Sequence, residues 1–281
     1  MPASLRVALT RSAEEFAARA GALLAAGPQT NLHATVLGAI RSDPSGRPDA
    51  LFATVEDRGE VVALALRSPP RPLIASEMEE AAAADLVEAW LREDAGLPGV
   101  VAPAPAASHI AAAWERLRGG KATLATAEAA HRLERVLAPE RPAPGALRAG
   151  RESDRALLVR WSIDFAREAE VDYGDAERIV DRRLAAGGLL VWEHGGPVSM
   201  VGVNDEVAGV VRLGPVYTPP EHRGRGYATS AVAAASEAAL ARGAHACMLF
   251  TDLANPTSNR IYAAVGYERF ADWREYRFAA V

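Results

Sequence analysis

The sequence has little cysteine, little lysine and no long apolar run, and each shortage excludes a class of protein. Cys247 is the single cysteine among 281 residues, so we expect neither an internal disulfide nor a cysteine-based metal cluster. It lies in an apolar run, where a buried structural thiol is its simplest interpretation. No apolar run reaches the roughly 18 residues that a membrane-spanning helix needs. We therefore expect no metal centre and no membrane partner.

Charge of one sign is also not in large excess. Lys and Arg number 31 against 36 Asp and Glu, a formal net charge of −5, and Lys121 is the sole lysine. A nucleic-acid-binding protein usually carries a basic footprint, so we expect no nucleic-acid partner. The N-terminus becomes charged too early for a secretory signal, and we expect a cytoplasmic location. The hydrophobic fraction of 49% is that of an ordinary globular protein.

A proline-rich stretch, APERPAPG at residues 138–145, divides the chain into halves of similar size. Proline fixes its own φ and disfavours helix in the preceding residue, so this stretch predicts an extended linker. We expect an N-terminal domain over residues 1–137, a linker over 138–146 and a C-terminal domain over 147–281.

The two halves predict the same order of elements. In the C-terminal half we expect strands at 147–149, 189–193, 198–203, 207–217 and 246–251, helices at 153–168, 175–186, 228–242 and 256–265, and two final strands within 267–278. In the N-terminal half we expect helices at 14–26, 31–40, 81–91 and 109–117, a hairpin at 51–66, and strands at 73–75, 100–101 and 131–136. Two helices, a hairpin and then alternating helix and strand occur in both, which indicates a duplicated domain.

The strongest chemical signal is the segment 216–228, VYTPPEHRGRGYA, in which a strand leads into a glycine loop that opens a helix. Glycine lets the backbone approach a ligand closely, and a helix N-terminus offers unpaired N–H groups and a positive dipole end. Together they predict a site for an anion such as a diphosphate, with Arg223 or Arg225 as a charged contact. The segment lacks the GxxxxGK[ST] and GxGxxG patterns of mononucleotide and dinucleotide sites.

Residues 223–228 read Arg-x-x-Gly-x-Ala, and residues 255–267 read NPTSNRIYAAVGY. They resemble the two signatures of the GNAT superfamily of acetyl-CoA-dependent N-acyltransferases, [QR]-x-x-G-x-[GA] and N-x-x-[AS]-x-x-x-Y-x-x-x-G-[FY]. The resemblance covers about residues 147–278. It implies an α+β fold of tandem GNAT-like domains, each a mixed, mainly antiparallel sheet flanked by helices. The N-terminal half has the acidic segment 74–80, IASEMEE, at the corresponding position, which implies a degenerate repeat without cofactor.

The resemblance also implies the roles of individual residues toward acetyl-CoA. The pantetheine arm would be held by Val216, Tyr217 and Thr218, and the diphosphate by Arg223, Gly224, Arg225, Gly226, Tyr227, Ala228 and Thr229. Asn255 corresponds to a residue that contacts coenzyme A, and Tyr262 to the tyrosine that acts as general acid toward the departing thiolate. Ser258 and Asn259 either line the cofactor or face solvent. Asn255 as a helix N-cap and Tyr262 as core remain alternatives.

The general base and the acceptor site are less well marked. Glu193 is our candidate for the base, with Asp205, Glu221 and His222 also suitably placed in the chain, whereas His245 reads as structural. We expect the acceptor wall, or else core packing, from Trp161, Phe165, Tyr173 and Trp192. The acidic balance favours a cationic amine.

The function expected from the resemblance is an N-acetyltransferase that moves an acetyl group from acetyl-CoA to a primary amine of a small molecule or peptide by direct attack. A non-catalytic acyl-CoA-binding regulatory or scaffold protein is the alternative, because no base is singled out. A longer acyl donor and a homodimer remain open.

Overall fold

The computed structural model describes residues 5–42, 47–171 and 174–280, which form two compact units. Unit 1 comprises the described residues up to 130, residues 252–254 and those from 270 onward, and unit 2 comprises residues 131–251 and 255–269.

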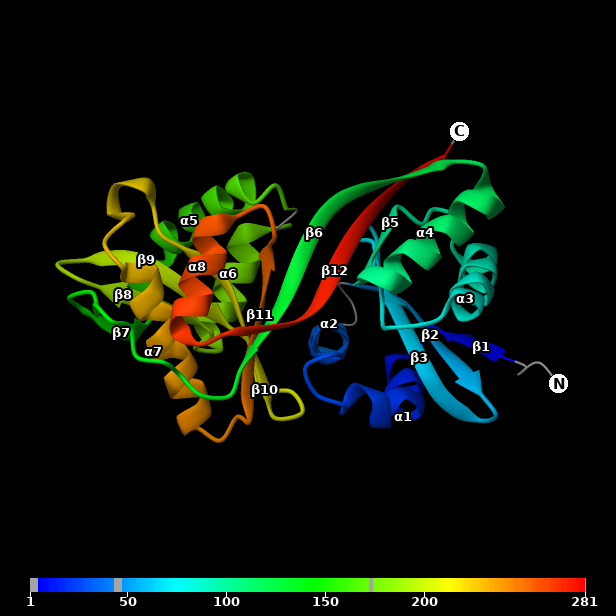
Figure 1. The fold of residues 1–281 in the computed structure, drawn as a ribbon, viewed down its shortest axis with the longest axis horizontal. Helices are drawn as coiled ribbons and strands as arrows, with labels where there is room; N and C mark the ends of the chain where they lie inside the picture. The colour runs from blue at the N-terminus through cyan, green and yellow to red at the C-terminus, as the bar shows by residue number, and fades with distance from the viewer. Residues whose placement is uncertain (1–4, 43–46, 172–173, 281) are drawn as a thin grey trace. The chain divides into compact units, whose positions relative to one another are not determined.

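Unit 1 is built from the first ten helices and strands of the chain and from the last strand (Figure 1). In chain order these are β1 (Leu5–Thr10), α1 (Ala13–Leu24), α2 (Asn31–Ser42), β2 (Leu51–Asp57), β3 (Glu60–Arg67), β4 (Leu73–Ala75), α3 (Glu80–Glu93), β5 (Gly99–Pro103), α4 (Ala104–Arg118), β6 (Lys121–Leu133) and β12 (Glu268–Ala279).

Unit 2 repeats this order with its own elements. They are β7 (Ala146–Ala149), the short 3₁₀ turn η2 (Glu152–Asp154), α5 (Arg155–Glu168), α6 (Ala176–Ala185), β8 (Leu189–Glu193), β9 (Pro197–Val203), β10 (Val210–Tyr217), the 3₁₀ turn η3 (Pro220–His222), α7 (Tyr227–Ala241), β11 (Ala246–Asp252) and α8 (Pro256–Val265).

The strand pairing of the two units is also the same. In unit 1, β1, β2, β3 and β4 pair antiparallel in sequence order and β4 pairs parallel with β5. In unit 2, β7, β8, β9 and β10 pair antiparallel and β10 pairs parallel with β11. The α+β fold of two duplicated, mainly antiparallel domains is therefore confirmed.

The central strands of each unit bury apolar residues on both faces, since successive strand residues point to opposite sides. In β8, Leu189 and Val191 pack with α5 and α6, whereas Trp192 packs with α7 and α8 on the other face. In β3, Ala63 and Ala65 belong to the core with α3 and α4, and Leu64 and Leu66 to the core with α1 and α2. This two-sided burial explains why the strands read as continuous apolar runs.

The compact units differ from the predicted division of the chain at both ends of the C-terminal half. Residues 270–280 belong to unit 1, because residues 273–277 of β12 pair antiparallel with β5 and Phe278 stacks on Trp114 at 4.5 Å between ring centroids. The proline-rich segment 138–145 belongs to unit 2 and does not stand between two bodies. Within it, Ala143 is buried and its N–H donates to the Ser230 hydroxyl at 2.8 Å.

Several predicted elements have other bounds in the structure, among them the helix predicted at 109–117, which begins at Ala104. β6 begins at Lys121, ten residues before the predicted strand 131–136, and the two predicted final strands are one strand, β12. The helix expected from Ser153 begins at Arg155, because the Asp154 carboxylate accepts the Arg151 N–H at 2.8 Å and closes the preceding turn.

Candidate functional site

The site begins where two parallel strands of unit 2 separate. β10 and β11 pair only at residues 210–212 and 246–248, after which β10 contains a bulge between Leu213 and Val216. Arg183 of α6 donates to the Gly214 carbonyl at 3.0 Å, so this carbonyl is satisfied within the bulge. A bulge bends its strand and interrupts the ladder. The end of β10 therefore has a free edge facing α8.

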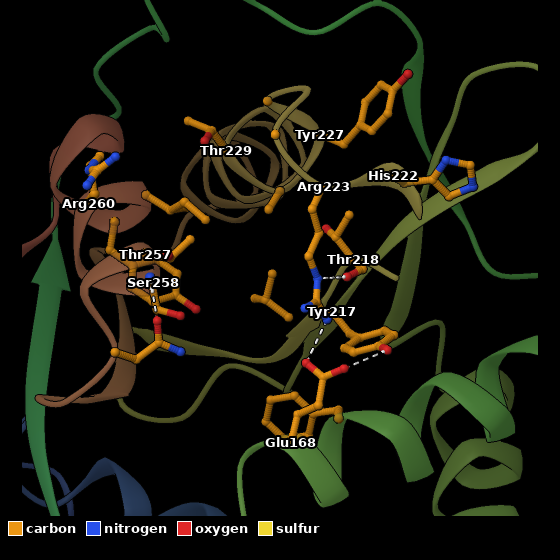
Figure 2. Close-up of a pocket in the computed structure, with 18 of the residues that line it drawn as sticks. Glu168, Tyr217, Thr218, His222, Arg223, Tyr227, Thr229, Thr257, Ser258 and Arg260 are labelled. Carbon is orange, nitrogen blue, oxygen red and sulfur yellow. Dashed lines mark hydrogen bonds and ion pairs between the residues drawn. The ribbon is translucent and has the colours of Figure 1, made fainter. Parts of the chain in front are cut away.

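A cavity of about 530 Å³ lies at this point, and unit 2 supplies all of its walls. Its lining comes from the end of α5, the end of β10, the loop 222–226, the start of α7 and the start of α8 (Figure 2). Both sequence signatures therefore meet in one cavity. Most of the residues predicted to bind cofactor line it: Val216, Tyr217, Thr218, Arg223, Gly224, Gly226, Tyr227, Ala228, Thr229, Asn255, Ser258 and Tyr262.

The N-terminus of α7 provides the backbone donors. Gly226 is its N-cap, with φ +77°, and no side chain caps this end of the helix. The first intrahelical bond runs from the Ser230 N–H to the Gly226 carbonyl, so the N–H groups before Ser230 have no acceptor within the helix. Gly224 also has a left-handed φ of +74° and no neighbour within 4 Å of the position that a Cβ would take. These features fit a diphosphate, which needs converging N–H groups and close backbone approach.

A buried serine fixes the end of β10. The Ser199 side chain on β9 is fully buried, and its hydroxyl bonds the Tyr217 carbonyl at 3.0 Å and the Thr218 hydroxyl at 2.8 Å. Thr218 is thereby held at the cavity wall, where the strand edge is available to an extended ligand.

Arg223 of the first signature does not point to the helix N-terminus. Its Nε donates to the Thr218 carbonyl at 2.8 Å and its Nη2 donates to the Glu168 carboxylate at 2.6 Å. Its guanidinium also lies over the Tyr217 ring, 5.7 Å from the centroid. These contacts hold the loop against β10 and α5, and the charged contact of Arg223 to a diphosphate stays a prediction.

Asn255 acts as the N-cap of α8, because its Oδ1 accepts the Ser258 N–H at 3.1 Å. Asn255 is therefore a helix N-cap, which the sequence left open as an alternative. Its carboxamide nitrogen is not used by the cap and can donate into the cavity that Asn255 lines. Thr257 and Ser258 add hydroxyls in the first turn of α8, and Arg260 adds a guanidinium to the same wall (Figure 2). Asn259 is not among the residues that line the cavity. Its Oδ1 accepts a hydrogen bond from the Thr251 hydroxyl at 3.2 Å.

Tyr262 lines the cavity from α8 with 8% of its surface exposed. Its ring meets that of Tyr267 edge-on, at 6.0 Å between centroids. Burial raises the pKa of the Tyr262 phenol to about 12, because tyrosinate is poorly solvated there. The hydroxyl therefore stays protonated at physiological pH and is available as a donor.

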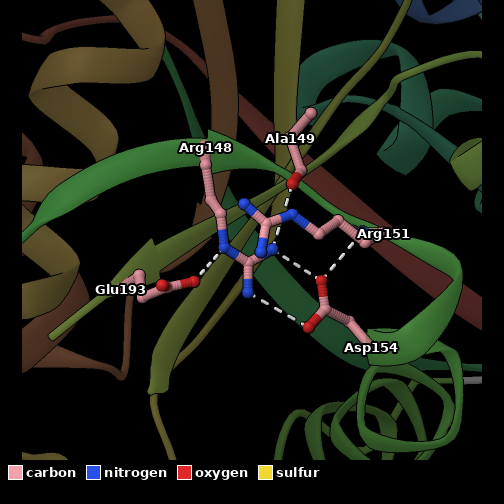
Figure 3. Close-up of polar contacts among 5 residues, drawn as sticks. All are labelled: Arg148, Ala149, Arg151, Asp154 and Glu193. Carbon is pink, nitrogen blue, oxygen red and sulfur yellow. Dashed lines mark hydrogen bonds and ion pairs between the residues drawn. The ribbon is translucent and has the colours of Figure 1, made fainter. Parts of the chain in front are cut away.

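Glu193, our candidate for the base, does not line the cavity. Its carboxylate pairs with the Nε of Arg148, whose Nη1 donates to Asp154 at 2.6 Å (Figure 3). The side chains of Arg148 and Asp154 are only 17% and 8% exposed. Glu193 thus ties β8 to β7 and, through Arg148, to the start of α5, and the structure places it outside the cavity.

The other predicted residues are divided between cavity and surroundings. His222 lines the cavity, edge-on to the Tyr227 ring at 6.4 Å, whereas Arg225, Asp205 and Glu221 are exposed residues outside it. Of the expected acceptor wall, Phe165 lines the cavity, and Tyr173 lies outside the described residues. Trp161 and Trp192 are buried in the two cores.

The sequence reasoning missed Glu168, Ala169, Thr257, Arg260 and Ile261, all of which line the cavity. Thr257 and Arg260 carried a signal, because they lie within the second signature. Glu168 is 55 residues away from its partner Arg223, and no local pattern joins them.

The corresponding place in unit 1 is acidic. β4 ends at Ala75, and Glu77, Glu79 and Glu80 occupy the approach to α3 where unit 2 presents glycine. Burial raises the pKa of Glu77. Carboxylates at this position repel a diphosphate.

The comparison of the sequence with protein families agrees with this geometry. The sequence model of the acetyltransferase (GNAT) family matches residues 155–267. Unit 2 carries a GNAT acetyltransferase domain. Members of this family transfer acyl groups from acyl-CoA. The comparison with curated proteins found no match.

Solved structures extend the likeness in fold to both units. A GCN5-related N-acetyltransferase from Sphaerobacter thermophilus is 17% identical, with a TM-score of 0.63 over 97% of this chain and 95% of its own. A tandem GNAT protein from the clavulanic acid biosynthesis pathway, without acetyl-CoA, is 16% identical, with a TM-score of 0.61 over 99% and 98% of the two chains. A GNAT-family acetyltransferase from Colwellia psychrerythraea is 10% identical, with a TM-score of 0.61 over 98% and 100%. At these identities the likeness establishes the fold.

Metal-binding clusters and membrane-spanning helices are both absent from the part of the chain that the structure describes. It contains no group of three or more His, Cys, Asp or Glu side chains placed to hold a metal ion. None of its helices combines the length and the apolar character that crossing a membrane requires.

Proposed function

We propose that unit 2 transfers the acetyl group of acetyl-CoA to a primary amine of a small molecule or peptide. The observation that carries this proposal is that the cavity joins the uncapped N-terminus of α7 to Tyr262 of α8 beside the free edge of β10. Acetyl-CoA, when bound, supplies an activated acetyl group as a thioester.

The proposed binding roles follow the walls of the cavity. The amides of residues 226–229 hold the diphosphate, with Thr229 and the hydroxyls at the start of α8 as further donors. The edge at Val216, Tyr217 and Thr218 receives the pantetheine arm, and Asn255 donates its carboxamide nitrogen. Arg260, which also lines the cavity, is available to approach a phosphate, whereas Arg223 is engaged with Glu168.

The proposed chemical role belongs to Tyr262. The amine nitrogen forms a bond to the acetyl carbon, the carbon–sulfur bond breaks, the sulfur gains one proton and the nitrogen releases one. A phenol with a pKa of about 12 is a weaker acid than a thiol of about 8.5, so Tyr262 stabilises the departing thiolate chiefly as a hydrogen-bond donor.

Calorimetry with acetyl-CoA, followed by a thiol-release assay over a panel of amines, tests the proposal. We expect binding in the micromolar range that is typical of enzyme substrates and amine-dependent release of coenzyme A. Absence of acetyl-CoA binding would overturn the proposal. Binding without transfer to any amine would instead favour the non-catalytic acyl-CoA-binding protein.

A further inference from the structure

The cavity of unit 2 is strongly asymmetric in charge. Arg223, Arg260 and the α7 N-terminus bring positive charge and N–H donors to its walls, and Glu168 is the single carboxylate among the residues that line it. A lone carboxylate in a site for a polyanionic ligand opposes that ligand, so its presence there points to a different group.

Glu168 lies where the backbone also favours a cation. It is the last residue of α5, whose final carbonyls carry the negative end of the helix dipole. A guanidinium already lies there, with Arg223 Nη2 at 2.6 Å from Oε2, and the Tyr217 hydroxyl donates to Oε1 at 3.2 Å. A carboxylate offers about four lone-pair sites, so two remain for another donor.

Apolar side chains also lie near this carboxylate at the same end of the cavity. Phe165, one turn earlier on α5, and Ala169, the next residue, line the same end of the cavity, and the Tyr217 ring lies beside them. Glu168 has 38% of its side chain exposed and is therefore accessible from the cavity.

We infer that Glu168 is the residue that selects the acceptor, its carboxylate binding the ammonium group of a primary amine that is carried on an apolar or aromatic body. The inference rests on the proposed function and names its acceptor class. Acidic acceptors are disfavoured, because their carboxylates would approach Glu168. Glu168 binds and positions the ammonium group, whose nitrogen releases one proton to solvent before it attacks the thioester, and Glu168 does not bind acetyl-CoA.

The test compares Glu168→Gln with the wild-type enzyme, using 2-phenylethylamine, butylamine and glutamate as acceptors. We expect transfer to the two apolar amines in preference to glutamate. The variant should raise KM for those amines roughly 10- to 100-fold, as expected for loss of a hydrogen bond to a charged group, with a smaller change in kcat. The dissociation constant of acetyl-CoA, measured by calorimetry, should stay within about 3-fold, a change worth less than 1 kcal/mol.

Asp164→Asn is the matched control, since it removes a carboxylate one turn earlier on α5 that pairs with Arg167 and does not line the cavity. It should leave both constants unchanged. Arg223→Gln breaks the same ion pair but keeps Glu168, so any rise in the amine KM should be clearly smaller than in Glu168→Gln.

Three results would overturn the inference while leaving the acetyl-CoA site intact. They are an unchanged amine KM in Glu168→Gln, an equal defect in Arg223→Gln, and preference for glutamate over the apolar amines. Acetyl-CoA binding without acetylation of any amine would also overturn it. Failure to bind acetyl-CoA would instead overturn the proposed function on which it rests.

Discussion

At the scale of single residues, the site depends on what burial does to one phenol and on the conformation of two glycines. Tyr262 keeps its proton because its anion would be poorly solvated. Gly224 and Gly226 take left-handed φ values that direct the first amides of α7 to the cavity. Substitution of Tyr262 should therefore affect turnover, and substitution of a glycine should affect acetyl-CoA binding.

Replacing Tyr262 by Phe should reduce kcat by roughly 100-fold, because the departing thiolate loses its donor. Affinity for acetyl-CoA should change by less than about 3-fold, since a neutral hydroxyl adds little to ground-state binding. Steady-state kinetics and calorimetry measure the two effects. Tyr267→Phe is the control, because that hydroxyl bonds Ser236 inside the core and should affect stability alone. Equal losses of turnover and affinity in Tyr262→Phe would assign it to packing.

Replacing Gly226 by Ala should weaken acetyl-CoA binding about 10-fold, because a non-glycine residue at φ +77° costs about 1–2 kcal/mol and shifts the first turn of α7 to relieve it. The added Cβ meets nothing closer than 3.7 Å, so crowding is not the cause. Gly195→Ala carries the same strain at φ +69° in the turn between β8 and β9. It should lower the melting temperature similarly without changing affinity, and an equal affinity loss there would contradict the argument.

At the scale of elements, an ion-pair network fixes the first strand and first helix of unit 2. Arg148 on β7 bridges Asp154 before α5 and Glu193 on β8 (Figure 3). Hydrogen bonding to Arg148 is the main cause that lowers the pKa of Asp154 below its ordinary value of 3.8. Because the pKa is lowered in the folded state, the network stabilises the protein above the unfolded pKa and loses its contribution as pH falls through the folded pKa.

Asp154→Asn should therefore lower the free energy of unfolding by about 1–3 kcal/mol at pH 7, since the partly buried Arg148 loses one of its two carboxylate partners and keeps only Glu193. The difference from wild type should shrink below about pH 4, where the unfolded carboxylate gains its proton. Urea unfolding at several pH values measures this. Asp181→Asn removes an exposed partner of Arg155 and should show little effect at any pH. A difference for Asp154→Asn that is constant from pH 7 to pH 3 would contradict the linkage.

At the scale of the whole molecule, unit 1 is not continuous in sequence, because the end of the chain returns to it after unit 2. β12 follows α8 of unit 2 in sequence, yet it pairs with β5 and contributes Trp273, 2% exposed, to unit 1. A cut of the chain at the proline-rich segment would therefore remove a strand from the N-terminal half.

Trp273→Ala should destabilise unit 1 selectively, by about 3–5 kcal/mol as for other buried Trp truncations. Hydrogen exchange should then accelerate in the hairpin of β2 and β3 and remain slow in β8 and β9. Trp161→Ala is the matched variant, because Trp161 is 3% exposed in the core of unit 2, and it should give the reverse pattern. Acceleration confined to unit 2 in Trp273→Ala would contradict the assignment of β12.

The sequence by itself determined the elements whose signals are local. The loop at Arg223–Thr229, the N-cap at Asn255 and the duplicated order of strands and helices were all predictable, since capping, glycine conformation and apolar periodicity act over a few residues. Only the tertiary structure decided the rest. β6 is an alanine-rich strand with no clear alternation, and its extent depends on pairing partners. The ion pairs of Glu193 with Arg148 and of Glu168 with Arg223 could not be predicted. Charged residues separated by tens of positions come into contact only after the sheet has brought their elements together.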